Sequence, residues 1–161
     1  QTGIAIAGWG IAVDHVISDF VNGAGERLVD EGAARGDLLF VEGQGSLLHP
    51  AYSGVTQGLL HGCQPDVLVL QHRAGQTVNE DYPARPIPPL DEVVALCERS
   101  AAAVRPARVA AIALNTRHLD DAGAAAAIAD AERATGLVAD DVVRHGPERV
   151  LAAVLAAVDA L

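Results

Sequence analysis

Residues 37–52 read D-L-L-F-V-E-G-Q-G-S-L-L-H-P-A-Y, and this stretch decides the predicted fold. The continuous apolar run at 38–41 is typical of a strand that is buried on both faces, as in a parallel sheet. Glu42 follows at the carboxyl end of that strand, where open α/β sheets bind their ligands. Gly43 and Gly45 allow a sharp turn and a close approach of the backbone to a ligand. A carboxylate there is costly without a partner, so we interpret Glu42 as a functional residue rather than an incidental acid in a tight turn.

The composition suits one α/β domain and argues against one class of partner. Half of the 161 residues are apolar but only 3% are aromatic, so we expect a core of Ala, Val, Leu and Ile, as in helices packed on a parallel sheet. The formal net charge of −10 argues against nucleic acid as a partner. The charges are spread along the predicted helices, which indicates a solubilising surface.

The cysteines, the apolar segments and the first residue predict the cellular compartment of the protein and a longer parent chain. Cys63 and Cys97 are far apart and have no metal-type spacing, so we expect two reduced, buried thiols in a cytoplasmic protein. No stretch is long enough to span a membrane and no signal peptide is visible, so we expect no membrane partner. The sequence opens at Gln1 without an initiator Met, and we therefore expect a longer parent protein.

Apolar runs and helical patterns alternate along the chain. We predict strands at 37–41, 67–71, 109–114 and, in a short form, 137–139. We predict helices at 14–33, 53–60, 90–103, 120–135 and 147–161. The Gly-punctuated segment 3–10 and the long polar connection 73–89 are expected to be loops, the second of them functional or mobile. Strands separated by helices in this rhythm predict a three-layer α/β domain with a mainly parallel central sheet.

Polar residues follow each of the three main predicted strands. They are Glu42-Gly43-Gln44-Gly45 after the first strand, Gln71-His72-Arg73 after the second and Asn115-Thr116-Arg117 after the third. Because the carboxyl ends of parallel strands share one edge, we expect these side chains to converge. Alone, His72 would be a structural histidine and Asn115 would cap a turn, but the joint pattern favours a ligand site. The sequence contains no phosphate loop of the G-x-x-x-x-G-K-[ST] or G-x-G-x-x-G type.

Motifs spread along the chain carry a resemblance to a known family. They are Gln1-Thr2-Gly3-Ile4, Ala7-Gly8-Trp9-Gly10, Asp14, Asp19-Phe20, Val41-Glu42-Gly43-Gln44-Gly45-Ser46-Leu47-Leu48-His49-Pro50, Tyr52-Ser53-Gly54-Val55-Thr56, Pro86-Ile87-Pro88-Pro89-Leu90 and Ile112-Ala113-Leu114-Asn115-Thr116. Together they resemble the D-glutamate N-acetyltransferase-like family over essentially the whole chain. The segment 42–56 is long and unusual enough to be specific.

This resemblance implies the organisation of a larger protein. Its members carry an N-terminal Rossmann-like domain, followed by a domain similar to P-loop nucleotide hydrolases and to dethiobiotin synthetase. The P-loop lies shortly before the segment that matches Gln1-Thr2-Gly3. We therefore expect residues 1–161 to be a single P-loop NTPase-like α/β domain, truncated at its N-terminus and lacking both the P-loop and the Rossmann-like domain. We expect this isolated chain to be inactive and to bind ATP or acetyl-CoA weakly.

The resemblance also implies a reaction, in which acetyl-CoA acetylates the amino group of D-glutamate or a related D-amino acid. The amine must lose a proton, so a general base such as Glu42, His49 or Asp14 is needed, and backbone amides at 43–46 are candidates to stabilise the tetrahedral intermediate. The expected cofactor-binding residues, for acetyl-CoA or ATP, are Gly43, Gln44, Gly45, Asn115 and Thr116. The expected substrate-binding residues are Gln1, Thr2, Gly3, Tyr52 and His72.

Two other functions stay open. One is an ATP-dependent ligase of the dethiobiotin-synthetase type, in which Glu42 and an Asp would hold Mg²⁺ between phosphate oxygens. The other is a non-catalytic nucleotide-binding or assembly domain. In each case we expect a small-molecule ligand. We also expect a homo-oligomer, because an exposed sheet edge or apolar face favours self-association.

Overall fold

The computed structural model describes residues 2–161, which divide into two compact units. The first unit runs to Pro65 and includes residues 103–105, and the second comprises 66–102 and 106–161. The prediction that residues 1–161 form a single domain stays a prediction.

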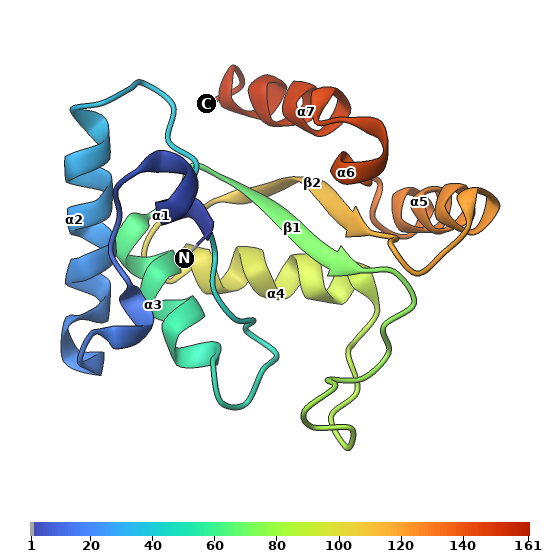
Figure 1. Ribbon diagram of the computed structural model, residues 1–161, viewed down its shortest axis with the longest axis horizontal. Coiled ribbons are helices and arrows are strands. Elements are labelled where there is room, and N and C mark those ends of the chain that lie inside the picture. Colours follow the sequence, from blue (N-terminus) through green and yellow to red (C-terminus); the bar gives the residue numbers. More distant parts are fainter. Residues whose placement is uncertain (1) are drawn as a thin grey trace. The chain divides into compact units, whose positions relative to one another are not determined.

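The second unit is built on a parallel sheet of three strands in the order β1-β2-β3 (Figure 1). The strands are β1 (Val67–Arg73), β2 (Arg108–Asn115) and β3 (Val138–Asp140). Arg73 pairs with Asn115, so β1 and β2 end side by side. Three of the four predicted strands are therefore confirmed, and their parallel pairing is confirmed with them.

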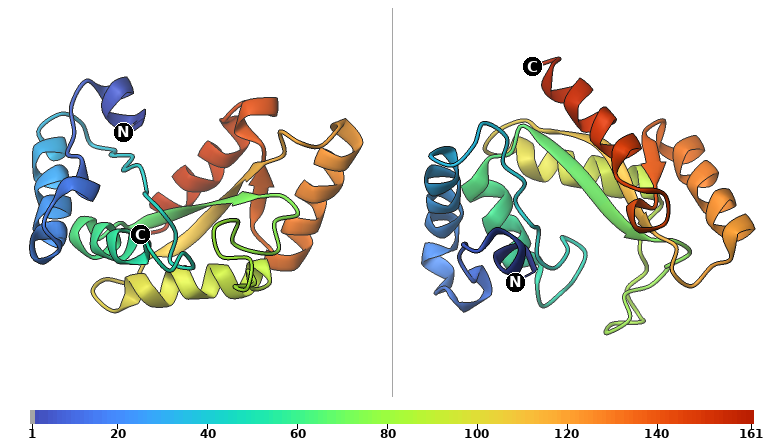
Figure 2. Two further views of the ribbon diagram at one scale, coloured as in Figure 1. Left: turned by 60° about the horizontal axis from the view of Figure 1, so that its bottom comes forward. Right: turned by 45° about the horizontal axis from the view of Figure 1, so that its top comes forward.

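Helices cover both faces of this sheet (Figure 2). The helices are α4 (Leu90–Ala102), α5 (Asp121–Thr135), the one-turn α6 (Val142–His145) and α7 (Glu148–Val158). On one face, Ile112 and Leu114 of β2 pack with Ile128 of α5 and with Leu90 of α4. Helix α7 covers the other face and buries Val150 and Val154. This arrangement confirms the three-layer α/β fold.

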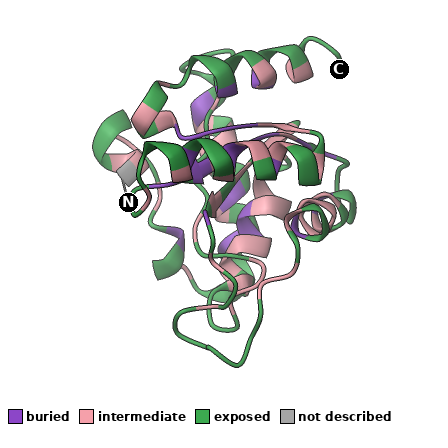
Figure 3. Ribbon diagram, turned by 90° about the vertical axis from the view of Figure 1, so that its right-hand side faces the viewer, coloured by how far each residue is buried: buried purple, intermediate pink, exposed green. Residues whose placement is uncertain are grey.

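The boundaries of α5 follow from its sequence. The carboxylate of Asp120 accepts a hydrogen bond of 2.7 Å from the amide of Gly123, which caps the N-terminus of the helix. Gly136 ends the helix in the left-handed conformation, with φ of 70°, where a side chain would be strained. Between these residues, the buried positions of the helix are Ala124, Ile128 and Ala131. Figure 3 shows the buried segments of the helices and strands in purple.

The first unit is helical. It comprises α1 (Thr2–Ala7), two short 3₁₀ turns (Val13–His15 and Ser18–Phe20), α2 (Val21–Ala33) and α3 (Ser53–Cys63). Helices α2 and α3 approach closely because α3 carries glycines where they cross. A Cβ at Gly62 would lie 2.1 Å from the carbonyl oxygen of Asn22, and one at Gly58 would lie 2.3 Å from Val21. The core of this unit consists of Val13, Val21 and Leu59.

Three sequence-based predictions in the first unit are wrong. Segment 3–10 is not all loop, because it begins with α1, and the helix predicted at 14–33 begins only at Val21, after the two 3₁₀ turns. Residues 37–41 form no strand, and Phe40 is 70% exposed. A strand requires a neighbour that bonds its amides and carbonyls, and no strand within residues 2–161 pairs with this run. Glu42 therefore does not end a sheet strand in this structure.

The remaining expectations concern the long connection, the thiols and membrane spans. The connection after β1 is irregular, as predicted, and is held by a bridge between Val78 and Pro86 and an ion pair between Arg73 and Glu80. Cys63 and Cys97 are both free, as predicted, but only half-buried, and this burial raises the pKa of each thiol. No helix within residues 2–161 is sufficiently long and apolar to cross a bilayer.

Candidate active site

Glu42 lies against the start of α1. Its Oε2 atom accepts a hydrogen bond of 2.6 Å from the amide of Gly3, although 39 positions separate the two residues. This bond lowers the pKa of the Glu42 carboxyl below its usual value, so the side chain is ionised at neutral pH. A Cβ at position 3 would come within 2.9 Å of Oε2, so glycine is needed for this contact. Glu42 and Gly3, which were both selected as site candidates from the sequence, are therefore in contact, whereas Gln1 lies outside the described residues.

A cavity of about 360 Å³ opens beside Glu42 within the first unit. Its wall is largely apolar and includes side chains of α1, the segment 9–13 and the run 38–41. Among the described residues that line it, Glu42 is the acidic one, Arg35 is the basic one and Gln44 is a neutral polar one. A largely apolar wall with a few charged and polar groups is typical of a site for a small ligand.

Arg35 is a residue that the sequence-based analysis missed. Its guanidinium carbon lies 4.4 Å from the centroid of the Trp9 ring, in a cation–π contact. Gly32 makes room for this pair, because a Cβ there would lie 2.9 Å from Leu39 and 3.3 Å from Trp9. The sequence carries no signal that links positions 9 and 35, since only the folded chain places them together.

The loop 43–52 is folded onto the start of α3. The hydroxyl of Thr56 donates a hydrogen bond of 2.6 Å to the carbonyl of Gln44. Gly45 has φ of +69°, and a Cβ there would lie 2.8 Å from Cβ of Tyr52, so only glycine fits without strain. The two glycines predicted to bind a cofactor differ in their structural role. The loop conformation requires glycine at position 45, whereas a Cβ at Gly43 would meet no atom within 4 Å.

His49 and Tyr52 form a stacked pair in this loop, with ring centroids 4.4 Å apart and an interplanar angle of 26°. Nδ1 of His49 accepts a hydrogen bond of 3.2 Å from the amide of Ala51, so the neutral ring carries its proton on Nε2. In this tautomer His49 offers a hydrogen-bond donor rather than a base. Asp14, the third candidate base, is exposed in the first 3₁₀ turn and does not line the cavity beside Glu42.

The second unit holds the other predicted site residues, and Thr116 is fully buried there. Its amide and hydroxyl donate hydrogen bonds of 2.9 and 2.5 Å to Oδ2 of Asp141. Burial raises the pKa of Asp141, but the bonds from Thr116 and from the amides of Arg144 and Val143 outweigh it and lower that pKa to about 2. The hydrogen bonds of the Thr116 side chain are thus made within the protein. Asn115, in contrast, is exposed, and its side-chain oxygen accepts a hydrogen bond of 3.1 Å from the amide of Arg117.

Arg144 fastens the loop that follows Thr116. Its guanidinium donates hydrogen bonds of 3.3 Å to the hydroxyl of Thr116, 2.9 Å to the carbonyl of Leu119 and 2.5 Å to Asp121. The neighbouring Asp140, which is 6% exposed, bonds to Nδ1 of His145 at 2.6 Å. The pair Asp140-Asp141 directly follows a predicted strand, and this signal was available in the sequence but was not used.

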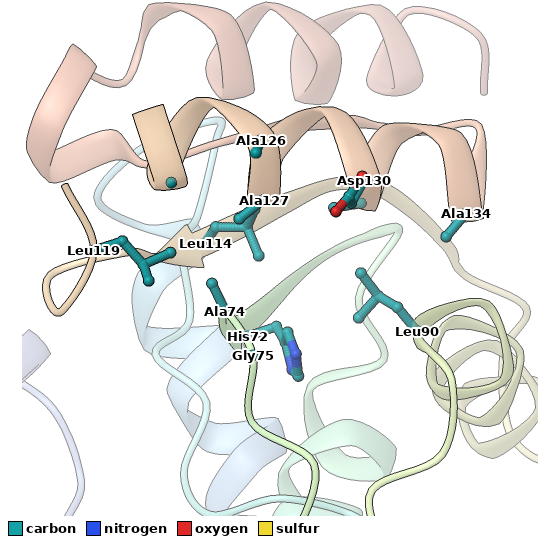
Figure 4. Close-up of a pocket in the computed structure, with 12 residues that line it drawn as sticks. His72, Ala74, Gly75, Leu90, Leu114, Leu119, Ala126, Ala127, Asp130 and Ala134 are labelled. Carbon is teal, nitrogen blue, oxygen red and sulfur yellow. The ribbon is translucent and has the colours of Figure 1, made fainter. Parts of the chain in front are cut away.

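His72 lines a second cavity, of about 410 Å³, within the second unit (Figure 4). The wall around it is formed by Leu90, Leu114 and a row of small residues on α5 that includes Ala127. Partial burial lowers the pKa of His72, so the ring is neutral at pH 7. Apart from His72, Asp130 is the one titratable residue among the described residues that line this cavity.

The predicted site residues therefore fall into two groups. Gly3, Glu42, Gly43 and Gln44 line one cavity of the first unit, and His49 and Tyr52 stack in the adjoining loop. His72, Asn115 and Thr116 belong to the second unit, where the adjacent ends of β1 and β2 are confirmed. The convergence of both groups on one ligand stays a prediction. Within residues 2–161, no group of three or more histidine, cysteine or acidic side chains is arranged to hold a metal ion.

Comparison with known proteins gives consistent matches over most of the chain. A family model described as "Domain of unknown function (DUF1611_C) P-loop domain" matches residues 1–151. A protein of Tritonibacter scottomollicae named D-glutamate N-acetyltransferase is 42% identical over 97% of this chain and 47% of its own length. A protein of the same name from Pseudoalteromonas sp is 41% identical over 72% of this chain and 35% of its own length.

A solved structure extends these matches to the fold. The crystal structure of a DUF1611 family protein from Anabaena variabilis has a TM-score of 0.91 and is 49% identical, over 96% of this chain and 46% of that chain. The chain thus spans about half the length, or less, of the proteins that it matches.

Proposed function

The chain belongs to the DUF1611 family, and from that premise we propose that it forms part of an enzyme that acetylates the amino group of D-glutamate or a related D-amino acid with acetyl-CoA. Membership confirms the resemblance drawn from the sequence motifs. The names of two relatives at 41–42% identity support the reaction. The chain covers only part of those relatives, so the activity is proposed for the complete protein.

The observation that carries the proposal is the ionised Glu42 at an apolar cavity. An amino acid at neutral pH presents an ammonium group, which the negative charge of the Glu42 carboxylate attracts. A carboxylate with a lowered pKa is a weak base, so we assign Glu42 to holding and orienting the ammonium rather than to removing its proton. The sequence analysis considered Glu42 as a general base, and this assignment replaces that role with binding of the substrate ammonium.

The proposed reaction is direct acyl transfer. After the ammonium loses one proton to solvent, the amine nitrogen attacks the thioester carbonyl carbon. The carbon–sulfur bond then breaks, and the coenzyme A thiolate takes up the second proton from the nitrogen. Amides of residues 43–46 and the Nε2–H of His49 are the proposed donors to the oxygen that becomes negatively charged.

A direct assay tests the proposal. The full-length protein is incubated with D-glutamate and acetyl-CoA, with and without ATP and Mg²⁺, and the products are identified by mass. N-acetyl-D-glutamate and free coenzyme A in equal amounts, formed without ATP, are the expected result. If neither D-glutamate nor any related D-amino acid gives an acetylated product, the proposed function is refuted.

The P-loop description of the family model favours a second candidate, an ATP-dependent ligase. Mg²⁺ commonly takes one or two protein carboxylates and completes its shell with water and phosphate oxygens, so Glu42 fits a ligand role without a larger acidic cluster. The same assay separates the two functions, because a ligase would form product only with ATP and Mg²⁺ and would release ADP or AMP.

A further inference from the structure

The cavity of the second unit has no role in the reaction described above. It has a volume of about 410 Å³ and is lined by residues of α4, α5, β1 and β2 (Figure 4). His72 and Leu114, which pair in the sheet one position before β1 and β2 end, both line it. Open α/β sheets bind their ligands at this edge, and sites for small molecules usually measure roughly 300–1,000 Å³. The cavity is therefore a candidate ligand site that lies within one unit.

Helix α5 gives the cavity a wall of small residues. Gly123, Ala127 and Ala131 recur at every fourth position and so lie on one side of the helix. Leu90 and Leu114 add larger apolar side chains to the lining. A wall of methyl groups and glycine is flat, and alanine loses no rotamer freedom when a ligand covers it. Such a lining suits a planar ring.

His72 supplies a polar group to this lining. Its ring is half-buried and neutral at pH 7, and within residues 2–161 it makes no hydrogen bond or ion pair. A neutral imidazole offers one N–H donor and one acceptor nitrogen. A ligand that presents donors and acceptors at the edge of a ring can therefore bond to it.

The charges around the cavity oppose an anion inside it. Among the described residues that line it, none is arginine or lysine. The carboxylate of Asp130 is exposed and pairs with Arg133 along the helix. Phosphates, or the two carboxylates of D-glutamate, would enter without a cation to bind them, at a cost in desolvation. The part of a ligand that enters this cavity is thus neutral, largely apolar and able to form hydrogen bonds.

We propose that this cavity binds the adenine ring of a nucleotide, with His72 bonded to the edge of the ring and the phosphates outside. Adenine is planar and uncharged, and its edge carries an acceptor nitrogen beside an amino group. The inference rests on the proposed function, or on its ligase alternative, for the kind of ligand, because acetyl-CoA and ATP both contain adenine. His72 is thereby assigned to the nucleotide rather than to the amino-acid substrate.

Calorimetric titration of the full-length protein with AMP tests the site, because AMP is a small nucleotide that carries adenine. GMP is the control for the base, and AMP should bind at least about 10-fold more tightly, the scale of one or two hydrogen bonds. Parallel titrations with ATP and coenzyme A show which of these two carries the ring in the larger ligand. No binding of AMP, or equal binding of AMP and GMP, overturns the proposal.

Two variants locate the binding. Ala127→Leu fills the cavity from α5 and should raise Kd for AMP by about 10-fold or more, since a filled cavity cannot also hold the ring. His72→Leu removes the hydrogen bonds but keeps an apolar side chain, and it should reduce the preference for AMP over GMP by about 2- to 10-fold. Ala125→Leu is the matched control, because Ala125 is exposed on the same helix and does not line the cavity.

Thermal unfolding of each variant shows whether it folds, and Ala126→Leu replaces Ala127→Leu if that variant does not, since Ala126 is more exposed and also lines the cavity. Wild-type affinity for AMP in both cavity variants would place the nucleotide elsewhere and overturn the proposal. The titration requires no acetyl transfer. A failed acetylation assay therefore leaves its result intact, and a failed titration leaves the proposed acetyltransferase standing.

Discussion

The two units place their charged side chains in different surroundings. In the second unit, Asp141 is surrounded by donors from Thr116 and α6, and Arg149 joins Glu132 to the carbonyl of Ala139. In the first unit, Arg35 rests on an aromatic ring and turns its charge toward a cavity. The comparison teaches that charged groups of the second unit hold the ends of its strands by hydrogen bonds, whereas Glu42 and Arg35 of the first unit line a cavity. Substitution of Asp141 in the second unit should thus affect mainly stability, and substitution of Glu42 in the first unit should affect mainly activity.

The largest effect is expected from Asp141→Ala. The substitution leaves two buried donors of Thr116 without an acceptor, at a cost of about 1–3 kcal/mol each, so the free energy of unfolding should fall by about 3–5 kcal/mol. Urea denaturation followed by circular dichroism measures this change. The matched control is Asp130→Ala, which removes an exposed pair with Arg133 and should cost less than about 1 kcal/mol. Equal losses in the two variants would show that the network around Asp141 contributes no more than a surface pair.

The second effect concerns activity. Glu42→Gln keeps the shape of the side chain but removes its charge, so kcat/KM of the full-length protein for the amino acid should fall by roughly 100-fold. The melting temperature should change little, because Glu42 is exposed. Glu26→Gln, at an exposed position of α2, is the control and should leave kcat/KM unchanged. If Glu42→Gln keeps nearly wild-type turnover, Glu42 has only a structural role. The charged residues of the two units would then not differ in function.

The third effect is a dependence of stability on pH. The pKa of Asp141 is about 2 in the folded chain against an ordinary value of 3.8, so the folded state favours the ionised carboxylate. The resulting stability is present above pH 3.8 and is lost as the pH falls toward 2, and it amounts to about 2 kcal/mol. Urea unfolding at several pH values between 2 and 5 measures it. In Asp141→Asn this part of the pH dependence should disappear, and its persistence would assign it to other carboxylates.

The smallest effect is expected in the loop of the first unit. Gly45→Ala places a side chain at φ of +69° and 2.8 Å from Tyr52, which should cost about 1–2 kcal/mol. Gly43→Ala is its control, because a Cβ there meets no atom within 4 Å and should be tolerated. Thermal unfolding of both variants decides whether the loop requires glycine only at position 45.

The fold of the second unit could be predicted because its signals are local. Apolar runs marked three strands, and Asp120 and Gly136 bounded a helix close to its predicted limits. The same reasoning failed at 37–41, because an apolar run shows that a segment can pair but does not supply the neighbouring strand. For the site, Glu42 and Gly3 were both selected from the sequence and lie in contact, although the strand predicted to precede Glu42 does not form within residues 2–161.

The amino-acid sequence alone was sufficient for the family, the parallel α/β fold and the choice of Glu42 as a candidate. Those conclusions depend on residue types and on spacing over a few positions, which local conformational preferences and burial translate directly into strands and helices. The tertiary structure was needed to see that Thr116 is buried on Asp141 and that Arg35 rests on Trp9. These contacts join residues 25 and 26 positions apart, and such distant pairs form only when packing brings their elements together.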